Sequence, residues 1–271
     1  IRKTNYLQLA GTKSLTTNKV VIVTGASSGI GASIAIALSK KKVGLVINYN
    51  KNMIGSEKVC AECLKNGADA LTIKANVADK ADCFSLVEKT LSYFGKIDLL
   101  VNNAAITRFV PHQNLAGLNQ KDFSEIYQTN VIGPFQMAHA SRKALEESSG
   151  AIVNISSHAG FSGLGSSIAY AASKGALNTL TLSLARALAP KISVNAVCPG
   201  FVDTNWAIQN FGDVGFKQFK KKIAEISPLK MIVEPEDVAQ AAIWLGLEAR
   251  AITGQLLVVD AGTHLSIETP L

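Results

Sequence analysis

The sequence has no long apolar run. No uninterrupted stretch approaches the ~20 apolar residues that a membrane span needs, and residues 1–18 lack the apolar core of a signal peptide. The chain is nevertheless 48% hydrophobic, which favours a globular protein with a sizeable core. We therefore expect a cytoplasmic protein without membrane contact, in which residues 1–18 form an N-terminal extension.

Cysteine is scarce, with four residues in the chain. Cys60 and Cys63 form a C-x-x-C, but no second pair exists to complete a zinc site, and the pair lies in a helical pattern. The four histidines lack ligand-like spacing. The sequence therefore predicts no metal site, and free thiols suit a reducing cytoplasm.

The net charge of +7 raises the question of nucleic-acid binding. The lysines, however, occur in short runs at 40–42 and 220–222, without interleaved aromatic residues. We interpret both runs as solvated faces and expect no nucleic-acid partner.

Seven short apolar runs, rich in valine and isoleucine, alternate with amphipathic helical stretches from residue 19 onward. This alternation predicts a single doubly wound α/β (Rossmann) domain over 19–271, with a central parallel sheet and helices on both faces. The rhythm breaks at about 201–230, which we expect to form a substrate lid. The runs lie at 20–23, 45–47, 71–73, 97–101, 151–155, 192–197 and 256–259, and the helical stretches at about 30–41, 54–66, 80–94, 122–148 and 168–189.

A glycine-rich turn at 24–31 (TGASSGIG) follows the first run and opens a helical stretch. Gly25 can adopt a positive φ, Gly29 leaves room for a pyrophosphate, and Gly31 lets the helix pack closely on the strand. The N-terminus of the helix offers free N–H groups to phosphates. A strand, this turn and a helix in succession predict dinucleotide binding.

Further motifs occur downstream in a fixed order. Together with the spacing of the glycine turn, they resemble the short-chain dehydrogenase/reductase family over about residues 19–265. The resemblance implies an oxidoreductase that transfers a hydride between a nicotinamide and a carbonyl/alcohol substrate. The motifs are Asn102-Asn103-Ala104-Ala105, Asn130, Asn154-Ile155-Ser156-Ser157, Tyr170 with Lys174, Cys198-Pro199-Gly200 with Val202 and Thr204, and Thr253-Gly254-Gln255 to Asp260-Ala261-Gly262.

Tyr170 and Lys174 are four residues apart on a predicted helix and therefore share a face. A lysine ammonium beside a phenol favours the phenolate and lowers the tyrosine pKa, so Tyr170 is predicted to be the general acid/base. The resemblance assigns the substrate oxygen to Ser157 rather than Ser156, because Ser157 stands thirteen residues before the tyrosine. It gives Asn130 a role in bracing a water that feeds protons to Lys174.

No carboxylate ends the second predicted strand, where NAD-preferring relatives carry an acid for the ribose 2′-hydroxyl. Tyr49 takes that position, and Lys51 stands where NADP-using relatives often carry arginine, although it could be an ordinary loop lysine. We predict that NADP(H) is preferred over NAD(H). Two positions depart from the family pattern. Ala105 stands where the family usually has glycine, and Asn76 stands where it usually has an adenine-binding aspartate. The expected cofactor-binding residues are Gly25, Ser27, Ser28, Gly29, Ile30, Gly31, Tyr49, Asn50, Lys51, Asn76, Val77, Asn103, Ala104, Ala105, Pro199, Gly200, Val202 and Thr204.

The substrate is less constrained, and the 3-oxoacyl-acyl-carrier-protein reductase of fatty acid synthesis stays open as an alternative. Carrier-protein reductases place basic residues just before the fifth strand, whereas this chain has Glu146 and Glu147, which the helix dipole disfavours there. We therefore favour free small-molecule carbonyls and do not favour acyl carrier protein as a partner. The expected substrate residues are Arg108, His158, Phe161, Phe201 and Trp206.

The helical stretches 122–148 and 168–189 are apolar on more than one face. This pattern indicates that a second helix face must be buried, and the resemblance implies a homotetramer with two-fold axes, because family members commonly pair these helices and the last strand region. A monomer that buries the second face internally is the alternative. A non-catalytic nucleotide-binding protein on the same fold is a distant alternative. Such a protein would be expected to lose Tyr170 or Lys174.

Overall fold

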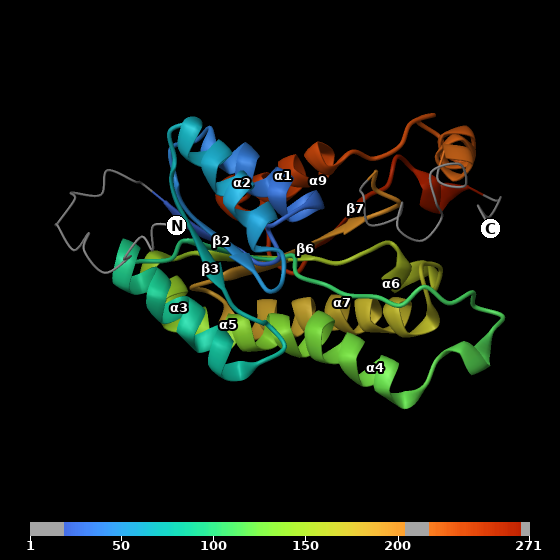
Figure 1. Cartoon of the computed structure of the whole chain (residues 1–271), viewed down its shortest axis with the longest axis horizontal. Helices are drawn as coiled ribbons and strands as arrows, with labels where there is room; N and C mark the ends of the chain where they lie inside the picture. Colours follow the sequence, from blue (N-terminus) through green and yellow to red (C-terminus); the bar gives the residue numbers. More distant parts are fainter. Residues whose placement is uncertain (1–18, 204–216, 267–271) are drawn as a thin grey trace.

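A twisted parallel sheet forms the centre of the molecule, in a computed structural model that describes residues 19–203 and 217–266 (Figure 1). Its seven strands run in the order β3-β2-β1-β4-β5-β6-β7. The order reverses between β1 and β4, as in a doubly wound fold. The strands are β1 (Val20–Val23), β2 (Gly44–Tyr49), β3 (Asp69–Lys74), β4 (Leu99–Asn102), β5 (Ala151–Ile155), β6 (Ser193–Pro199) and β7 (Leu256–Val259).

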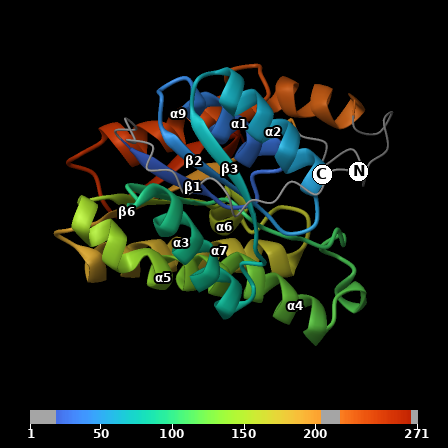
Figure 2. The ribbon, with the colours of Figure 1, turned by 60° about the vertical axis from the view of Figure 1, so that its left-hand side comes forward.

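Helices cover both faces of the sheet, as Figures 1 and 2 show. One layer contains α1 (Gly29–Ser39), α2 (Met53–Lys65) and α9 (Pro235–Ile243). The opposite layer contains α3 (Lys80–Phe94), α4 (Gln120–Tyr127), α5 (Gly133–Ser148) and α7 (Ile168–Leu188), and the short α6 (Ala159–Ser162) lies near the amino-terminal end of α7. None of the helices described is long and apolar enough to cross a membrane.

Continuous apolar sequence follows from burial on both faces of the strands. In β1, Val21 and Val23 enter the core beneath α1 and α9, whereas Val20 and Ile22 enter the core beneath α3 and α5. All four side chains are fully buried. The predicted fold class and the seven predicted strands are therefore confirmed, with strand ends shifted by up to two residues.

The prediction of one helix over 122–148 is wrong. A π-helical turn, Gln128–Ile132, separates α4 from α5. Pro134 has no N–H to donate to the carbonyl of Asn130, so the regular helical hydrogen-bond register cannot continue there. The break places Asn130 inside the turn, with its side chain buried.

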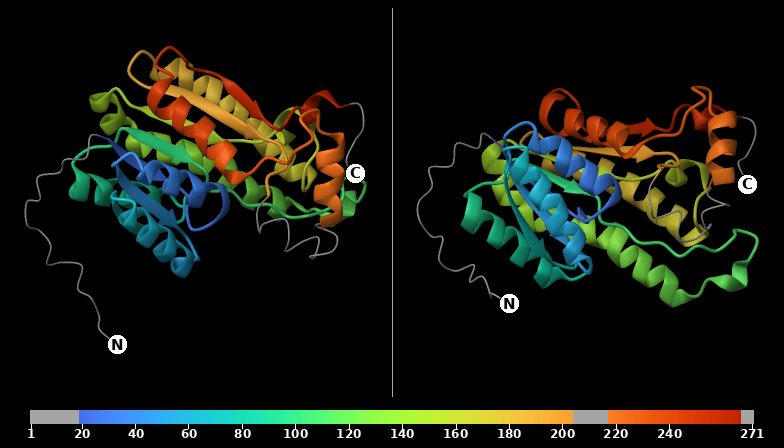
Figure 3. Two further views of the ribbon diagram at one scale, coloured as in Figure 1. Left: turned by 90° about the horizontal axis from the view of Figure 1, so that it is seen from above. Right: turned by 45° about the horizontal axis from the view of Figure 1, so that its top comes forward.

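The sequence reading also missed α9, although its start carries strong signals. Pro235 occupies the first turn, and Glu234 and Asp237 form a reciprocal capping box. The helix packs along α1 in the same layer (Figure 3), and Glu236 in its first turn accepts a hydrogen bond from Ser33 Oγ of α1 at 3.1 Å. It therefore stabilises the layer that carries the glycine turn.

Candidate functional site

The turn between β1 and α1 has the geometry of an anion cradle. Gly25 and Gly29 have φ values of +62° and +56°, which residues with a Cβ rarely adopt. Ser28 caps α1 without a side-chain hydrogen bond, and the first turn of the helix holds no acidic residue. The α1 N-terminus therefore keeps its N–H groups and partial positive charge for a phosphate.

Two asparagines outside the turn hold it in place. Asn48, at the end of β2, accepts a hydrogen bond from the Gly25 N–H at 3.2 Å and donates to the Ala75 carbonyl at 3.0 Å. The Asn103 amide donates to the carbonyls of Thr24 and Gly25 at 2.9 and 3.1 Å. Asn48 was not among the predicted site residues, although a polar side chain ending an apolar strand was a signal for it.

Gly31 is constrained by the turn itself. A Cβ there would lie 2.4 Å from Asn103 Nδ2 and 2.7 Å from the Gly25 carbonyl oxygen. The glycine at position 31 therefore lets α1 begin directly against the turn. The contacts that exclude a Cβ come from the turn and Asn103, whereas the sequence had predicted that they would come from the packing of the helix on the strand.

The expected adenosine-binding residues gather at the carboxyl ends of β2 and β3. Tyr49 is half-buried at the end of β2, and Asn50 and Lys51 are exposed just beyond it. Asn76 Oδ1 accepts a hydrogen bond from the Ala78 N–H at 3.2 Å, which shapes the loop after β3. Val77 is buried, and a Cβ on Gly133 at the start of α5 would lie 3.0 Å from it.

Tyr170, Ser157 and Lys174 meet where β5 ends against α7. The Ser157 side chain hydrogen-bonds the Tyr170 hydroxyl. Lys174 Nζ lies 5.6 Å from the centre of the Tyr170 ring and donates to the Ile155 carbonyl at 2.8 Å. The structure thus brings these three predicted residues together, with Tyr170 and Lys174 both buried.

Burial controls the titration of this pair. It raises the pKa of Tyr170 to about 12, opposed in part by the hydrogen bond from Ser157. It lowers the pKa of Lys174 to about 8. The expected lowering of the Tyr170 pKa by Lys174 is therefore not seen in this structure, because desolvation of the phenolate dominates.

Asn130 links the π-helical turn to two neighbouring segments. Its amide accepts from the Ile106 N–H and donates to the Ile106 carbonyl, both at 2.9 Å. Its Nδ2 also donates to Ser173 Oγ at 3.0 Å. Ser173 precedes Lys174 on α7, so Asn130 lies close to the lysine segment, and its predicted link to a water stays a prediction.

A buried polar cluster that the sequence did not predict lies beside α7, the helix that carries Tyr170 and Lys174. Ser156 Oγ is 2.6 Å from Asn178 Oδ1 and 3.3 Å from the Lys174 carbonyl oxygen. Cys198 Sγ lies 3.8 Å from Asn178 Oδ1. Ser156, the serine not chosen for the substrate, therefore holds α7 against β5 and β6.

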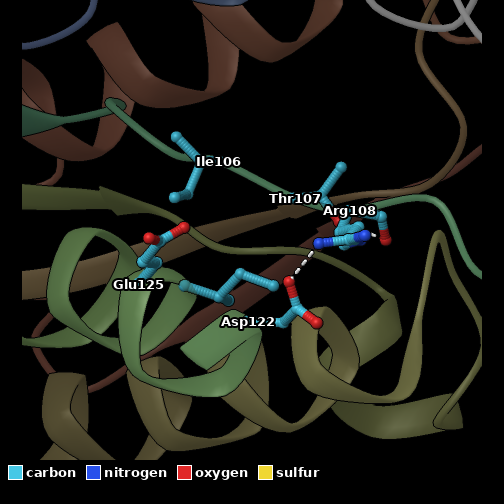
Figure 4. Close-up of a pocket in the computed structure, with 6 residues that line it drawn as sticks. Ile106, Thr107, Arg108, Asp122 and Glu125 are labelled. Atoms are coloured by element: carbon cyan, nitrogen blue, oxygen red, sulfur yellow. Dashed lines mark hydrogen bonds and ion pairs between the residues drawn. The ribbon is translucent and has the colours of Figure 1, made fainter. Parts of the chain in front are cut away.

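The expected substrate residues occupy several surroundings. Arg108 is ion-paired to the buried Asp122 and lines a cavity of about 340 Å³ with Ile106, Thr107 and Glu125 (Figure 4). Phe161 is 52% exposed on α6. Phe201 packs edge-on against Phe219 with ring centres 4.8 Å apart. Thr204 and Trp206 lie outside the described residues.

The segment after β6 closes one side of the site, beside the end of β7. Gly200 N–H donates to the Val259 carbonyl at 3.0 Å, and the Pro199 carbonyl accepts from the His158 N–H at 2.8 Å. Val202 pairs with Val233. Pro199 and Gly200 therefore lie between the end of β5 and the end of β7.

The two alanines that follow β4 contact the glycine turn. Ala104 and Ala105 are half-buried, and Ala104 N–H donates to Thr24 Oγ1 at 3.1 Å.

Glu146 is not without local support. Its carboxylate accepts a hydrogen bond from Arg142 Nε at 2.7 Å, one turn earlier on α5. The helix-dipole argument made from the sequence is therefore incomplete for Glu146, because an i,i+4 ion pair offsets the unfavourable dipole. Glu147 is exposed.

Comparisons with known proteins agree with this geometry. The family model described as enoyl-(acyl carrier protein) reductase matches residues 25–264. The chain belongs to the short-chain dehydrogenase/reductase family. It is 40% identical over 247 residues to a protein named as a ketoacyl reductase of the granaticin polyketide synthase of Streptomyces violaceoruber, covering 91% of this chain and 96% of that protein.

Two further relatives extend the comparison. A 3-oxoacyl-(acyl-carrier-protein) reductase of Staphylococcus aureus is 34% identical to this chain over 250 residues. The match covers 91% of this chain and 98% of that protein. A solved structure from Burkholderia xenovorans, described as a short-chain dehydrogenase/reductase, superposes with a TM-score of 0.86 at 39% identity, covering 93% of this chain and 99% of that one. The chain is therefore an oxidoreductase that moves a hydride between a nicotinamide cofactor and a carbonyl/alcohol pair.

The residues present fit such a cofactor. Gly25 and Gly29 hold the turn in positive φ values, and the first turn of α1 contains no acidic residue that would repel a phosphate. When bound, the nicotinamide supplies or accepts the hydride. The protein's own part is to orient the substrate and to hold or move a proton.

Proposed function

We propose that this protein is an NADP(H)-preferring reductase of carbonyl compounds in which Tyr170 is the general acid/base. The observation that carries the proposal is the hydrogen bond between Ser157 and Tyr170, with Lys174 beside the ring. Ser157 would donate to the substrate oxygen where charge develops, and Tyr170 would deliver the proton. Lys174 is placed to support that transfer, and Asn130 to hold the segment of α7 that carries the lysine.

Tyr170→Phe tests this role because it keeps the ring and removes the proton. Turnover with any accepted ketone should fall by ~10²–10⁴-fold, the usual contribution of a general acid/base. Cofactor binding, followed by quenching of protein fluorescence or by calorimetry, should stay within about threefold of wild type. Near-normal turnover in the variant would refute the proposed mechanism.

The proposed cofactor preference rests on the loop after β2. No carboxylate follows Tyr49 to repel a 2′-phosphate, and exposed Lys51 offers a cation at the same loop. Half-buried Ser27 and exposed Ser28 add hydroxyl donors in the glycine turn. The family relationship supports a nicotinamide cofactor, and these side chains support NADPH as the preferred form.

Free carbonyl compounds are the proposed substrates, and a β-ketoacyl group on acyl carrier protein is the second candidate. Two relatives named as ketoacyl reductases favour the second candidate. Exposed Glu147 before β5 argues against an acidic partner docking there, although the Arg142–Glu146 pair weakens that argument. The deciding experiment compares one β-ketoacyl group on carrier protein and on a short thioester, at low and high salt.

We further propose a homotetramer with two-fold axes. On α7, Ala172 is exposed and Ala176 half-exposed, which leaves a small-residue face free for another helix. Phe135 on α5 and Leu182 on α7 are each 45% exposed. At the sheet edge, the side chains of β7 are all half-exposed, so two distinct surfaces offer apolar area for association.

Residues 19–271 are proposed to act as one domain, in which 201–230 forms a lid. Within the described part of that segment, Lys220 pairs with Asp203, and Leu229 N–H donates to the Ala261 carbonyl at 3.2 Å. The lid is thereby tied to the loop that follows β7. The four cysteines are free thiols, which suits the expected cytoplasmic location.

A further inference from the structure

The segment that ends β5 contacts α7 at both of the proposed catalytic side chains of that helix. The Ile155 carbonyl accepts a hydrogen bond from Lys174 Nζ at 2.8 Å. Two residues later, the Ser157 side chain hydrogen-bonds the Tyr170 hydroxyl. The relative position of the ammonium and the two hydroxyls therefore depends on how the intervening residue, Ser156, is held against α7.

Asn178, one turn after Lys174 on α7, holds Ser156 in place. Its Oδ1 accepts a hydrogen bond from the Ser156 hydroxyl at 2.6 Å, and that hydroxyl lies 3.3 Å from the Lys174 carbonyl oxygen. The thiol of Cys198, on β6, lies 3.8 Å from the same Oδ1. The side chains of Ser156, Asn178 and Cys198 are at most 5% exposed. One amide oxygen thus joins β5, β6 and α7 in the core, where an unpaired polar group is costly.

The nitrogen of the same amide makes no comparable contact. Asn178 Nδ2 is buried and has no hydrogen-bond partner within residues 19–203 and 217–266. It faces α6, where a Cβ on Gly160 would lie 2.7 Å from it. Buried amide nitrogens are usually paired, so hydrogen bonding alone does not select an amide here. A carboxylate of the same shape would keep every hydrogen bond that Asn178 makes to the described residues.

The surroundings of Lys174 make it sensitive to a charge at this position. The titratable groups that face it are Tyr170 on its own helix and Cys198 on β6. The end of β5, α6 and the π-helical turn contribute no ionisable side chain, and the buried Asp122 of α4 is paired with Arg108. Burial is therefore the main influence on the lysine, and it lowers the pKa of Lys174 to about 8.

We propose that Asn178 is a positioning residue for the reaction, which acts through Ser156. It holds the end of β5 against α7, so that the Ser157 hydroxyl and the Lys174 ammonium stay aligned on Tyr170. Because the amide is neutral, it does so without placing a charge beside the lysine. The inference rests on the proposed role of Tyr170 as general acid/base. A misplacement of about 1 Å can cost on the order of 10²-fold in rate, so a loosened contact should lower turnover rather than cofactor binding.

Asn178→Leu and Ser156→Ala each remove the link between β5 and α7, the second without adding bulk to the core. With NADPH and ethyl 3-oxobutanoate as the probe, each should lower kcat by about 10- to 100-fold and change KM for NADPH by less than about threefold. Thr181→Val is the matched control, because it removes a buried hydrogen bond with Asn154 from the same helix. It should lower stability and leave kcat within about threefold of wild type.

Asn178→Asp tests the effect of charge without any substrate. Its carboxylate should raise the pKa of Lys174 toward the ordinary lysine value. Urea unfolding without cofactor, at about pH 8 and about pH 9.5, then reports the lysine: its contribution to the rise in unfolding free energy should shrink, because the folded chain also keeps the proton. Burial raises the pKa of the Cys198 thiol to about 11, so it stays protonated at both pH values. Thr181→Val should keep the wild-type rise.

The outcomes separate the inference from the proposed function. If Ser156→Ala and Asn178→Leu keep the kcat of Thr181→Val, the cluster only stabilises the fold and the positioning role is overturned. If Asn178→Leu does not fold, Ser156→Ala decides the matter. An unchanged pH response in Asn178→Asp would overturn the electrostatic part. Normal turnover in Tyr170→Phe would instead remove the proposed function itself, whatever the other variants do.

Discussion

Asn130 Nδ2 donates a hydrogen bond to Ser173 Oγ at 3.0 Å, and the same hydroxyl donates to the Tyr170 carbonyl at 2.7 Å. The π-helical turn between α4 and α5 is thus joined to the turn of α7 that separates Tyr170 from Lys174. The link explains why a break in a long helix occurs beside the proposed catalytic residues: the widened turn directs one amide toward α7 and the Ile106 backbone at once.

Asn130→Ala should therefore lower stability as well as activity. It removes three hydrogen bonds and leaves partly buried backbone groups of Ile106 without partners, at a cost of about 1–3 kcal/mol. Urea unfolding without cofactor measures the change. Asn50→Ala, at an exposed loop position, is the matched control and should stay within about 0.5 kcal/mol of wild type. Equal stability of the two variants would contradict the structural role of Asn130.

The pH dependence of reduction should report Lys174. Burial lowers the lysine pKa to about 8 and raises that of Tyr170 to about 12, so Tyr170 keeps its proton over the working range. We expect kcat/KM for reduction to fall as pH rises through about 8, because the ammonium that supports proton transfer is lost. Lys174→Arg should move the fall to higher pH, since arginine keeps its charge. An unchanged profile in that variant would assign the titration to another group.

The free energy of unfolding should respond to the lowered Lys174 pKa in the opposite direction: it should rise with pH where activity falls. The folded-state pKa of Lys174 lies below the ordinary lysine value of 10.5, so between about pH 8 and 10.5 the unfolded chain binds more protons. The free energy of unfolding should therefore rise with pH across that window. Lys174→Met, which has no titrating group, should lose this contribution while other groups keep theirs.

The fold was predictable because buried parallel strands produce an unmistakable pattern. Runs such as 20–23 are apolar throughout, and helices alternate with the strands along the described residues. The positions of the glycine turn and Ser157 followed from motifs at the ends of those strands, and those of Tyr170 and Lys174 from a motif on the helix that became α7. These features depend on local sequence, so the sequence alone could place them.

Properties set by distant contacts were not predictable in the same way. The Tyr170 pKa depends on how deeply α7 is buried, which spacing along one helix does not specify. Asn48 supports Gly25 across a strand interface. The Arg142–Glu146 pair, by contrast, is an i,i+4 pair within one helix that the sequence already contained. The rings of His158 and His264 meet, with their centres 6.4 Å apart, only because the fold brings the ends of β5 and β7 to one edge of the sheet.

Lys51 provides a direct test of cofactor choice. If its ammonium contacts the 2′-phosphate, Lys51→Ala should lower the NADPH/NADH ratio of kcat/KM by about tenfold, as for one charge-assisted hydrogen bond at an exposed site. Lys65→Ala, at the far end of α2 with a side chain 78% exposed, is the control and should leave the ratio unchanged. A wild-type ratio below one would refute the proposed preference before any variant is made.

Assembly can be tested by placing charge on the exposed apolar helix faces. Phe135 and Leu182 are each 45% exposed on α5 and α7, and both should be covered in the proposed homotetramer. Aspartate at either position would have to be desolvated in an apolar interface, so Phe135→Asp and Leu182→Asp should shift the particle to a smaller species. Light scattering gives the mass, which for a single chain is 28.6 kDa. Leu115→Asp, on a 71% exposed leucine outside these two helices, should leave the mass unchanged. A wild-type mass of one chain in dilute solution would rule out the tetramer, and equal masses for all four proteins would place the interface elsewhere.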